Sequence, residues 1–443
     1  MESPESFALV IVTEAASWSA TPGGILAVGD GPSAGLVLGA DAGVSTLRAR
    51  FGAASAQAQV QSEPGPGTLE VWPPAAVLAT GTALPVAVTL VTSSGDSVDV
   101  TDDAVWSSTA PRISIVTNAP GQQGTLLGRA AGSATVTARV DRLQATLPVL
   151  VTAATLQGVG VQPPPAVVSW APSRFAATGR FSDGTTQDVT GLVTWAPSER
   201  TVLRIRGTGP DRGIARGIDA GTVQVLAHPV GGAPTTVAVT VNTSPPTSLA
   251  LLVPDGGVAV GTHPQAQAFA QTSGGLTVDV TALVEWSSSD PTLATISSVV
   301  RPGSITTLRA GAPTLTARFA GLSTGVPLQI LSDALTRLSV TAPASLAVGA
   351  SATAAVTATL SGGGAELLGD DVVWSVDRPG VLGVSNAPGA RGRLLALGPG
   401  TATLQARTRS GLPALQATAS VSVSAAALRT SHVGAARLQR SRQ

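Results

Sequence analysis

The chain has 443 residues, which suits about three domains, and its 26 basic residues balance its 26 acidic residues. The absence of cysteine excludes disulfides, thiolate metal sites and a cysteine nucleophile, and a total of three histidines argues against a multi-histidine metal centre. Zero net charge argues against nucleic-acid binding, which requires a basic excess, and no apolar run reaches the ~18 residues of a membrane span.

The chain begins on an incomplete unit over residues 1–63. Its first tryptophan, Trp18, follows Met1 far more closely than the later tryptophans follow the starts of their own units. The apolar stretch 7–12 is short and is preceded by Glu2 and Glu5, so it does not have the organisation of a signal peptide. We therefore expect that the opening strands of this unit are missing. The recorded start is then internal to a longer secreted protein, or the chain is a fragment.

Five tryptophans mark an internal repeat of about 89 residues. They are Trp18, Trp106, Trp195, Trp286 and Trp374. Within 32 or 33 residues of each tryptophan comes a second recurring block, such as ATVTAR, that ends on a basic residue. These basic residues are Arg50, Arg139, His228, Arg318 and Arg407. A loop between the two blocks places Asp30, Asn118 and Asn386 at the same spacing of 12 residues from their tryptophans.

Each repeat is predicted to be a β-sandwich. In 133–140 the apolar residues alternate with Ser, Thr and Arg, which is the period of a strand with one buried face. Turn sequences such as 182–184 separate several short strands in each repeat, and no stretch has helical periodicity. The register gives complete units at 66–153, 154–243, 244–332 and 333–424. Because almost no linker separates them, a semi-rigid rod on the order of 150 Å is expected.

The last segment, 425–443, breaks the strand pattern. It contains four arginines and His432 but no acidic residue. The arginines are Arg429, Arg437, Arg440 and Arg442. A flexible basic tail is the simplest interpretation, with contact to an anionic surface as the alternative.

The repeat resembles the group 2 bacterial immunoglobulin-like domain, which also occurs in invasin- and intimin-type surface proteins. The stretches that carry the resemblance are 181–190 (FSDGTTQDVT), 284–291 (VEWSSSDP) and 131–138 (AGSATVTA). It implies an all-β fold of tandem immunoglobulin-like Greek-key β-sandwiches in a linear array. The family has no catalytic residues to transfer. The 333–424 unit departs from the pattern, because its D-G-x-x-x-D-V-T segment reads GGGAELLGDD over 362–371.

Acidic residues before the second tryptophan form the best candidate metal site in the chain. They are Asp96, Asp99, Asp102 and Asp103. Clustered carboxylates are ligands that Ca²⁺ prefers. The alternative is that Asp in D-V-T and S-D-G accepts backbone N–H bonds in turns, and we favour it. No other metal or cofactor is predicted.

Three further features have a functional and a structural interpretation. Outward arginines at Arg139, Arg318 and Arg407 could bind an acidic glycan, or they could shield a strand edge. Trp72 and Trp170 lie outside the repeat register and could stack on sugars or pack at junctions between units. Residues 31–35 fit the G-x-S-x-G nucleophile pattern, but they occupy a loop of the repeat, so catalysis is not expected.

The sequence therefore predicts a non-enzymatic array at the cell surface or in the extracellular space, acting as a structural spacer or adhesion module. Its partners are a cell-surface protein or glycan of unknown identity and the neighbouring repeats of the same chain. The alternatives are a glycan-binding module and the non-catalytic arm of a larger secreted enzyme.

Overall fold

The computed structural model describes residues 16–22, 26–28, 37–39, 43–62, 67–92, 95–119, 122–208, 211–229, 232–298 and 301–425. These residues form strands and turns and contain no helix, so none of them forms a helix that could cross a membrane. The predicted all-β fold is confirmed. We refer to the predicted ranges 1–63, 66–153, 154–243, 244–332 and 333–424 as units 1 to 5.

The first three units are built from strands joined by turns and loops. Unit 1 contains β1 Ser17–Thr21, β2 Leu26–Val28, β3 Val37–Gly39, β4 Gly43–Phe51 and β5 Ala54–Ser62. Unit 2 contains β6 Thr68–Trp72, β7 Ala76–Ala79, β8 Ala83–Pro85, β9 Ala87–Val91, β10 Ser97–Asp99, β11 Val105–Ser108, β12 Ser114–Val116, β13 Thr125–Gly128, β14 Gly132–Val140 and β15 Leu143–Thr152. Unit 3 contains β16 Leu156–Gln162, β17 Val167–Val168, β18 Ser173–Arg174, β19 Ala176–Phe181, β20 Thr186–Asp188, β21 Val193–Pro197, β22 Leu203–Ile205, β23 Ile214–Gly217, β24 Gly221–Pro229 and β25 Thr235–Asn242.

The last two units follow the same plan. Unit 4 contains β26 Pro246–Leu252, β27 Val258–Ala259, β28 Gln267–Thr272, β29 Thr277–Asp279, β30 Glu285–Ser288, β31 Ala294–Ile296, β32 Ile305–Thr307, β33 Thr314–Phe319, β34 Leu322–Pro327 and β35 Ile330–Leu331. Unit 5 contains β36 Leu335–Thr341, β37 Ser345–Ala347, β38 Ser351–Thr353, β39 Ala355–Leu360, β40 Ala365–Leu368, β41 Val372–Val376, β42 Leu382–Val384, β43 Arg393–Ala396, β44 Gly400–Thr408 and β45 Gln416–Ser424.

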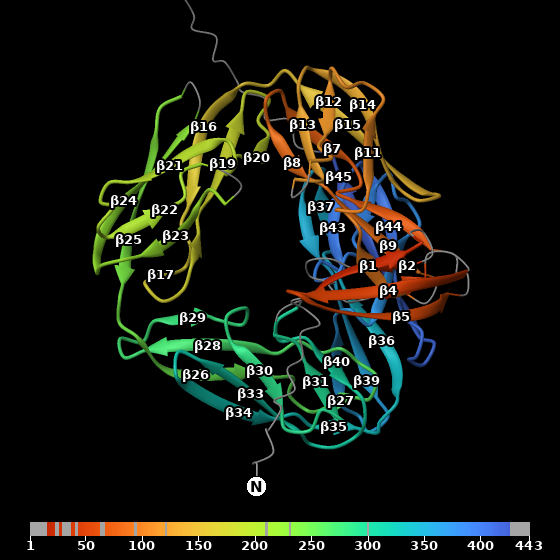
Figure 1. Cartoon of the computed structure of the whole chain (residues 1–443). Coiled ribbons are helices and arrows are strands. Elements are labelled where there is room, and N and C mark those ends of the chain that lie inside the picture. The colour runs from red at the N-terminus through yellow and green to blue at the C-terminus, as the bar shows by residue number, and fades with distance from the viewer. Residues whose placement is uncertain are drawn as a thin grey trace, which may run out of the picture.

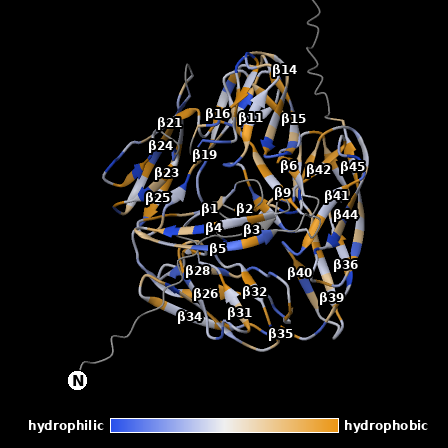
Figure 2. Cartoon of the chain, turned by 45° about the vertical axis from the view of Figure 1, so that its right-hand side comes forward, coloured by the Kyte–Doolittle hydropathy of each residue, from blue (hydrophilic) through white to orange (hydrophobic). Residues whose placement is uncertain are grey.

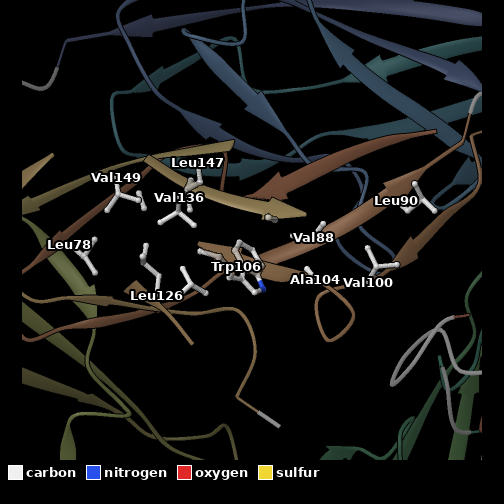
Figure 3. Close-up of a cluster of buried hydrophobic side chains, with 14 of the residues drawn as sticks. Leu78, Val88, Leu90, Val100, Ala104, Trp106, Leu126, Val136, Leu147 and Val149 are labelled. Atoms are coloured by element: carbon white, nitrogen blue, oxygen red, sulfur yellow. The ribbon is translucent and has the colours of Figure 1, made fainter. Parts of the chain in front are cut away.

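Unit 2 illustrates the sandwich. One sheet has the order β10-β9-β6, a second has the order β11-β14-β15-β7, and a small third sheet has the order β12-β13-β8. Side chains from the first two sheets meet in one buried cluster, in which Val88 and Leu90 lie with Trp106, Val136 and Leu147 (Figure 3). Apolar and polar residues alternate along the long strands of unit 2 such as β14 and β15, so each of these has one face in the core (Figure 2).

The tryptophan register is explained by strand pairing. In every unit the tryptophan lies directly opposite an alanine of the neighbouring long strand, as Trp106 lies opposite Ala138. The small alanine leaves room for the indole on the core face. The tryptophans of units 2 to 5 are buried, whereas Trp18 of unit 1 is only partly buried.

The units follow one another in linear order along the chain, but they do not extend into the predicted rod. Unit 5 returns to contact unit 2, so that units 2 to 5 form a closed circuit (Figure 1). The prediction of a rod assumed that abutting units continue in one direction. Instead, specific polar side chains hold the two ends of the circuit together.

Candidate functional site

The D-V-T segments have a structural role inside each unit. Asp99 Oδ1 accepts hydrogen bonds from the backbone N (2.9 Å) and Oγ1 (2.6 Å) of Thr101, and Thr101 Oγ1 accepts one from the N of Val88. Asp188 and Thr190 of unit 3, and Asp279 and Thr281 of unit 4, repeat the two bonds from backbone N atoms. The motif therefore fixes the turn before the tryptophan strand, as the alternative interpretation of these aspartates proposed.

The four aspartates of the calcium candidate have separate roles. Asp99 is engaged with Thr101, Asp96 lies 3.1 Å from the Nη1 of Arg409 in unit 5, and Asp102 and Asp103 are exposed to solvent. Among the described residues, no three acidic or histidine side chains are grouped as metal ligands would be. The structure thus does not bring these four carboxylates together.

The recurring residue 12 positions after the tryptophan holds the tryptophan strand in place. In unit 2, Asn118 Oδ1 accepts from the N of Trp106 at 2.7 Å, and Asn118 Nδ2 donates to the O of Trp106 at 3.0 Å. Asn386 does the same for Trp374 in unit 5. In unit 4 the hydroxyl of Ser298 replaces the amide and makes both bonds to Trp286. The spacing of 12 residues is therefore a packing feature. The equivalent residue of unit 1, Asp30, lies outside the described residues.

The predicted arginine row lies on the outer face of the long strands. Arg139, Arg318 and Arg407 are exposed, and each pairs with the residue before its unit's tryptophan. Arg139 Nε donates to the O of Asp141 within its own hairpin. His228 takes the same position in unit 3 and is exposed. The three arginines therefore belong to three different units, and no strand pairing brings them together.

The two tryptophans outside the register lie at contacts between units. Trp170 of unit 3 packs edge-on against Phe319 of unit 4, with ring centroids 5.8 Å apart, and its Nε1 donates to the O of Ser244 at 2.9 Å. Trp72 lines a cleft of about 420 Å³ between units 2 and 5, together with Glu70 and Asn386. A larger cavity, of about 730 Å³, lies between units 2 and 3.

Two junctions between consecutive units use the same design. Between units 2 and 3, Gln187 Oε1 accepts from the N of Ala79 (3.2 Å) and from Thr82 Oγ1 (3.0 Å). Between units 4 and 5, Glu366 Oε2 accepts from the N of Ala259 at 2.9 Å. The segments that donate these hydrogen bonds, 79–82 and 259–262, share the sequence A-x-G-T. Polar side chains of one unit therefore satisfy backbone donors of the preceding one.

Two acidic residues directly before the tryptophan strand of unit 5 supply further contacts. Asp371 Oδ2 accepts from the N of His263 at 2.6 Å, and Asp371 Oδ1 lies 2.8 Å from His263 Nδ1. Asp370 forms an ion pair with Arg301. Both partners belong to unit 4. Asp370 and Asp371, which occupy the positions of Asp102 and Asp103 in unit 2, therefore hold unit 5 to its predecessor.

Unit 5 also contacts unit 2, more than 290 residues earlier in the sequence. We call this the closing contact. Arg391 Nη2 donates to the O of Gly95 (2.8 Å) and to Ser97 Oγ (2.6 Å). Asn386 Nδ2 donates to both carboxylate oxygens of Glu70 at 3.2 Å. Together with the pair of Arg409 and Asp96, these bonds connect one face of unit 5 to one face of unit 2.

Burial changes the acid–base behaviour of the junctions. Desolvation raises the pKa values of Glu70 and Glu366, although hydrogen bonds from Asn386 to Glu70 and from Ala259 to Glu366 oppose the rise. Desolvation and the nearby Arg409 lower the pKa of Arg391 to about 10. The guanidinium therefore remains charged at neutral pH. The site is a set of largely buried charged side chains that pair with one another where units meet.

The sequence did not predict the junction residues Glu70, Gln187, His263, Arg391 and Arg409. One signal was present, because unit 5 has Leu367, Leu368 and Gly369 where the other complete units have D-V-T. The G-x-S-x-G stretch at 31–35 and the tail from 426 onward lie outside the described residues.

Comparison with models of known protein families gives no match. The chain is 29% identical over 255 residues to ice-binding protein 1 of Shewanella frigidimarina (strain NCIMB 400), a match covering 56% of this chain and 27% of the relative. The chain thus spans about a quarter of that relative's length. Solved structures that resemble it include surface layer protein SbsC, domains 4–9 (13% identity, 93% of this chain, 74% of that one, TM-score 0.27). Another is the protocadherin gammaB7 EC3-6 cis-dimer (13% identity, 80% of this chain, 99% of that one, TM-score 0.16).

Proposed function

We propose that the chain is a non-enzymatic, extracellular or cell-surface array of group 2 bacterial immunoglobulin-like units, acting as a structural spacer or adhesion module. The observation that supports this function is where the charged side chains lie and what they bond to. The clusters of buried charge lie where units meet, and their members bond to one another. The same role suits the non-catalytic arm of a larger secreted enzyme.

Each unit is equipped to be an independent structural element. Units 2 to 5 each have a buried cluster around their repeat tryptophan, to which the preceding unit adds Ala79 in unit 3, Trp170 in unit 4 and Ala259 in unit 5. Such units hold a neighbouring domain at a defined distance through geometry alone. We infer that the match to ice-binding protein 1 reflects this scaffold, because its 255 residues are the length of nearly three units.

The spacer function is tested by surface display. The chain is anchored to a bacterial surface at its C-terminal side, with a peptide epitope at its N-terminal side, and is compared with unit 5 displayed alone. A spacer predicts stronger antibody binding to the epitope on the longer array. Equal accessibility would contradict it. Saturable binding of the free chain to cells would favour adhesion instead.

The cleft between units 2 and 5 favours glycan binding as a second candidate function. Trp72 offers an aromatic surface there on which a sugar ring could stack, whereas both carboxylate oxygens of Glu70 already accept from Asn386. A glycan array probed with the wild-type chain and with Trp72→Ala tests it. Signals that the substitution removes would support the candidate, and a blank array would reject it.

A further inference from the structure

The closing contact depends on a glycine that the other complete units do not have. Gly383 lies nine residues after Trp374, in β42. Units 2, 3 and 4 have Ile115, Arg204 and Thr295 at the same spacing and the same strand position. A Cβ atom on Gly383 would lie 2.4 Å from Cγ of Pro74 in unit 2. Unit 5 therefore has a residue without a side chain at a position where Pro74 of unit 2 leaves no room for one.

The opposing face of unit 2 is also specific to that unit. Glu70 of β6 pairs with Thr89 in the sheet, and the equivalent positions in units 3, 4 and 5 are Gly160, Ala250 and Ser339. The carboxylate that receives Asn386 therefore occurs in unit 2 alone among the complete units. Arg409, which pairs with Asp96, lies three residues after the alanine opposite its unit's tryptophan, where units 2 and 4 have Asp141 and Ala320. Both faces thus carry residues suited to each other.

The closing contact is weaker in kind than the cores it connects. Arg391 of this contact is buried, but the side chains of the outer pair, Arg409 and Asp96, remain 21% and 42% exposed, so salt screens the attraction within that pair. Units 2 and 5 have cores that do not depend on each other. The contact can therefore be lost while every sandwich remains folded.

We propose that this contact is a reversible clasp between units 2 and 5. With the clasp closed, the array is a compact circuit. With it open, the units extend, and the distance between the two ends of the array increases without unfolding. This inference rests on the proposed spacer function and deepens it, since opening the clasp would lengthen the spacer. Whether the clasp exists can be tested without assuming that function.

Small-angle X-ray scattering of the whole chain tests the clasp with a matched pair of variants. Gly383→Ile introduces the residue that unit 2 has at this position, and its side chain would collide with Pro74. Thr295→Ile introduces the same residue, isoleucine, at the equivalent position of unit 4, which is exposed to solvent. Gly383→Ile is expected to raise the radius of gyration roughly 1.5-fold, the change from a compact circuit toward a rod. Thr295→Ile is expected to leave it unchanged.

A second variant guards against misfolding of unit 5. Asp96→Arg places a cation beside Arg409 from the side of unit 2, and it is expected to open the array as well. For the wild-type chain, a rise in salt from low concentration to about 1 M, where screening reaches ~3 Å, is expected to increase the radius of gyration reversibly. If both variants keep the wild-type radius while remaining folded, there is no clasp. If only salt has no effect, the contact is permanent and the proposed reversibility is wrong.

Discussion

The side-chain amide of Asn386 donates hydrogen bonds to both carboxylate oxygens of Glu70, across 316 residues of sequence. The same amide donates to the backbone O of Trp374. One side chain therefore belongs both to the repeated architecture of a unit and to the contact that closes the circuit. This dual use shows how the array acquires specific junctions, since a few changes to repeated positions are sufficient.

The asparagine that holds the tryptophan strand should contribute measurably to stability. Asn118→Ala leaves the buried backbone groups of Trp106 without their partners, at a cost of about 1–3 kcal/mol to unit 2. Hydrogen exchange in β11 should then be faster by roughly 10- to 100-fold. Asn118→Ser is the matched control, because Ser298 performs this role in unit 4. Asn118→Ser should lose less stability than Asn118→Ala, and equal losses for both variants would contradict the interpretation.

Glu366 should make the junction between units 4 and 5 sensitive to pH. Because burial raises its pKa above the ordinary 4.5, the folded chain binds a proton here more tightly than the unfolded chain. This linkage stabilises the folded state below pH 4.5 and is lost as pH rises through the raised pKa. Glu366→Gln removes the buried charge but keeps the oxygen that accepts from Ala259. At neutral pH it should stabilise the junction by about 1 kcal/mol.

The measurement is thermal unfolding of both chains at neutral pH and near pH ~5, just above the ordinary carboxyl range. The advantage of the variant should shrink as pH falls, since the wild-type carboxylate then takes up its proton. Gln187→Glu provides the reverse change at the junction of units 2 and 3. Gln187→Glu should destabilise the chain at neutral pH. The effect should be smaller than the stabilisation by Glu366→Gln, because Gln187 is only half-buried. If Glu366→Gln destabilises the chain at neutral pH, the charge itself is needed.

The fold within a unit could be predicted from the sequence because its contacts recur. Trp106 opposite Ala138 is one of five such pairs, and each repetition strengthens the same periodic signal. Outward positions of the long strands follow from alternation, which is why Arg139 and Arg318 are exposed as their strand positions indicate.

The contacts between units could not be predicted in the same way. The pairing of Glu70 with Asn386 depends on the angles at three successive junctions, and no local pattern encodes those angles. The sequence contained only departures from the repeat, such as Gly383 in unit 5 and Glu70 in unit 2. A departure identifies a position with a special role, but it does not identify the partner. Rod-like extension was therefore expected where a closed circuit occurs.

Calcium should have no effect on the stability of unit 2. Asp99 already receives two hydrogen bonds from Thr101, and Asp96 is paired with Arg409, so neither is free to join Asp102 and Asp103 around an ion. Unfolding temperatures in excess Ca²⁺ and in excess chelator should agree. A rise with Ca²⁺ that Asp99→Asn removes would show that the four carboxylates rearrange to bind the ion.

The junction between units 3 and 4 should depend on the pair of Trp170 and Phe319. The edge-on contact of their rings is worth about 0.5–1.5 kcal/mol beyond the burial of apolar area. A double-mutant cycle with Trp170→Leu and Phe319→Leu isolates this term, and hydrogen exchange at the junction reports it. Trp170→Leu should cost more than Phe319→Leu, because it also removes the hydrogen bond to the O of Ser244. As a control, Phe175 contacts Trp195 inside unit 3, so a change there should leave the junction unaffected. A coupling energy of zero would mean that the two rings are neighbours without stabilising the junction.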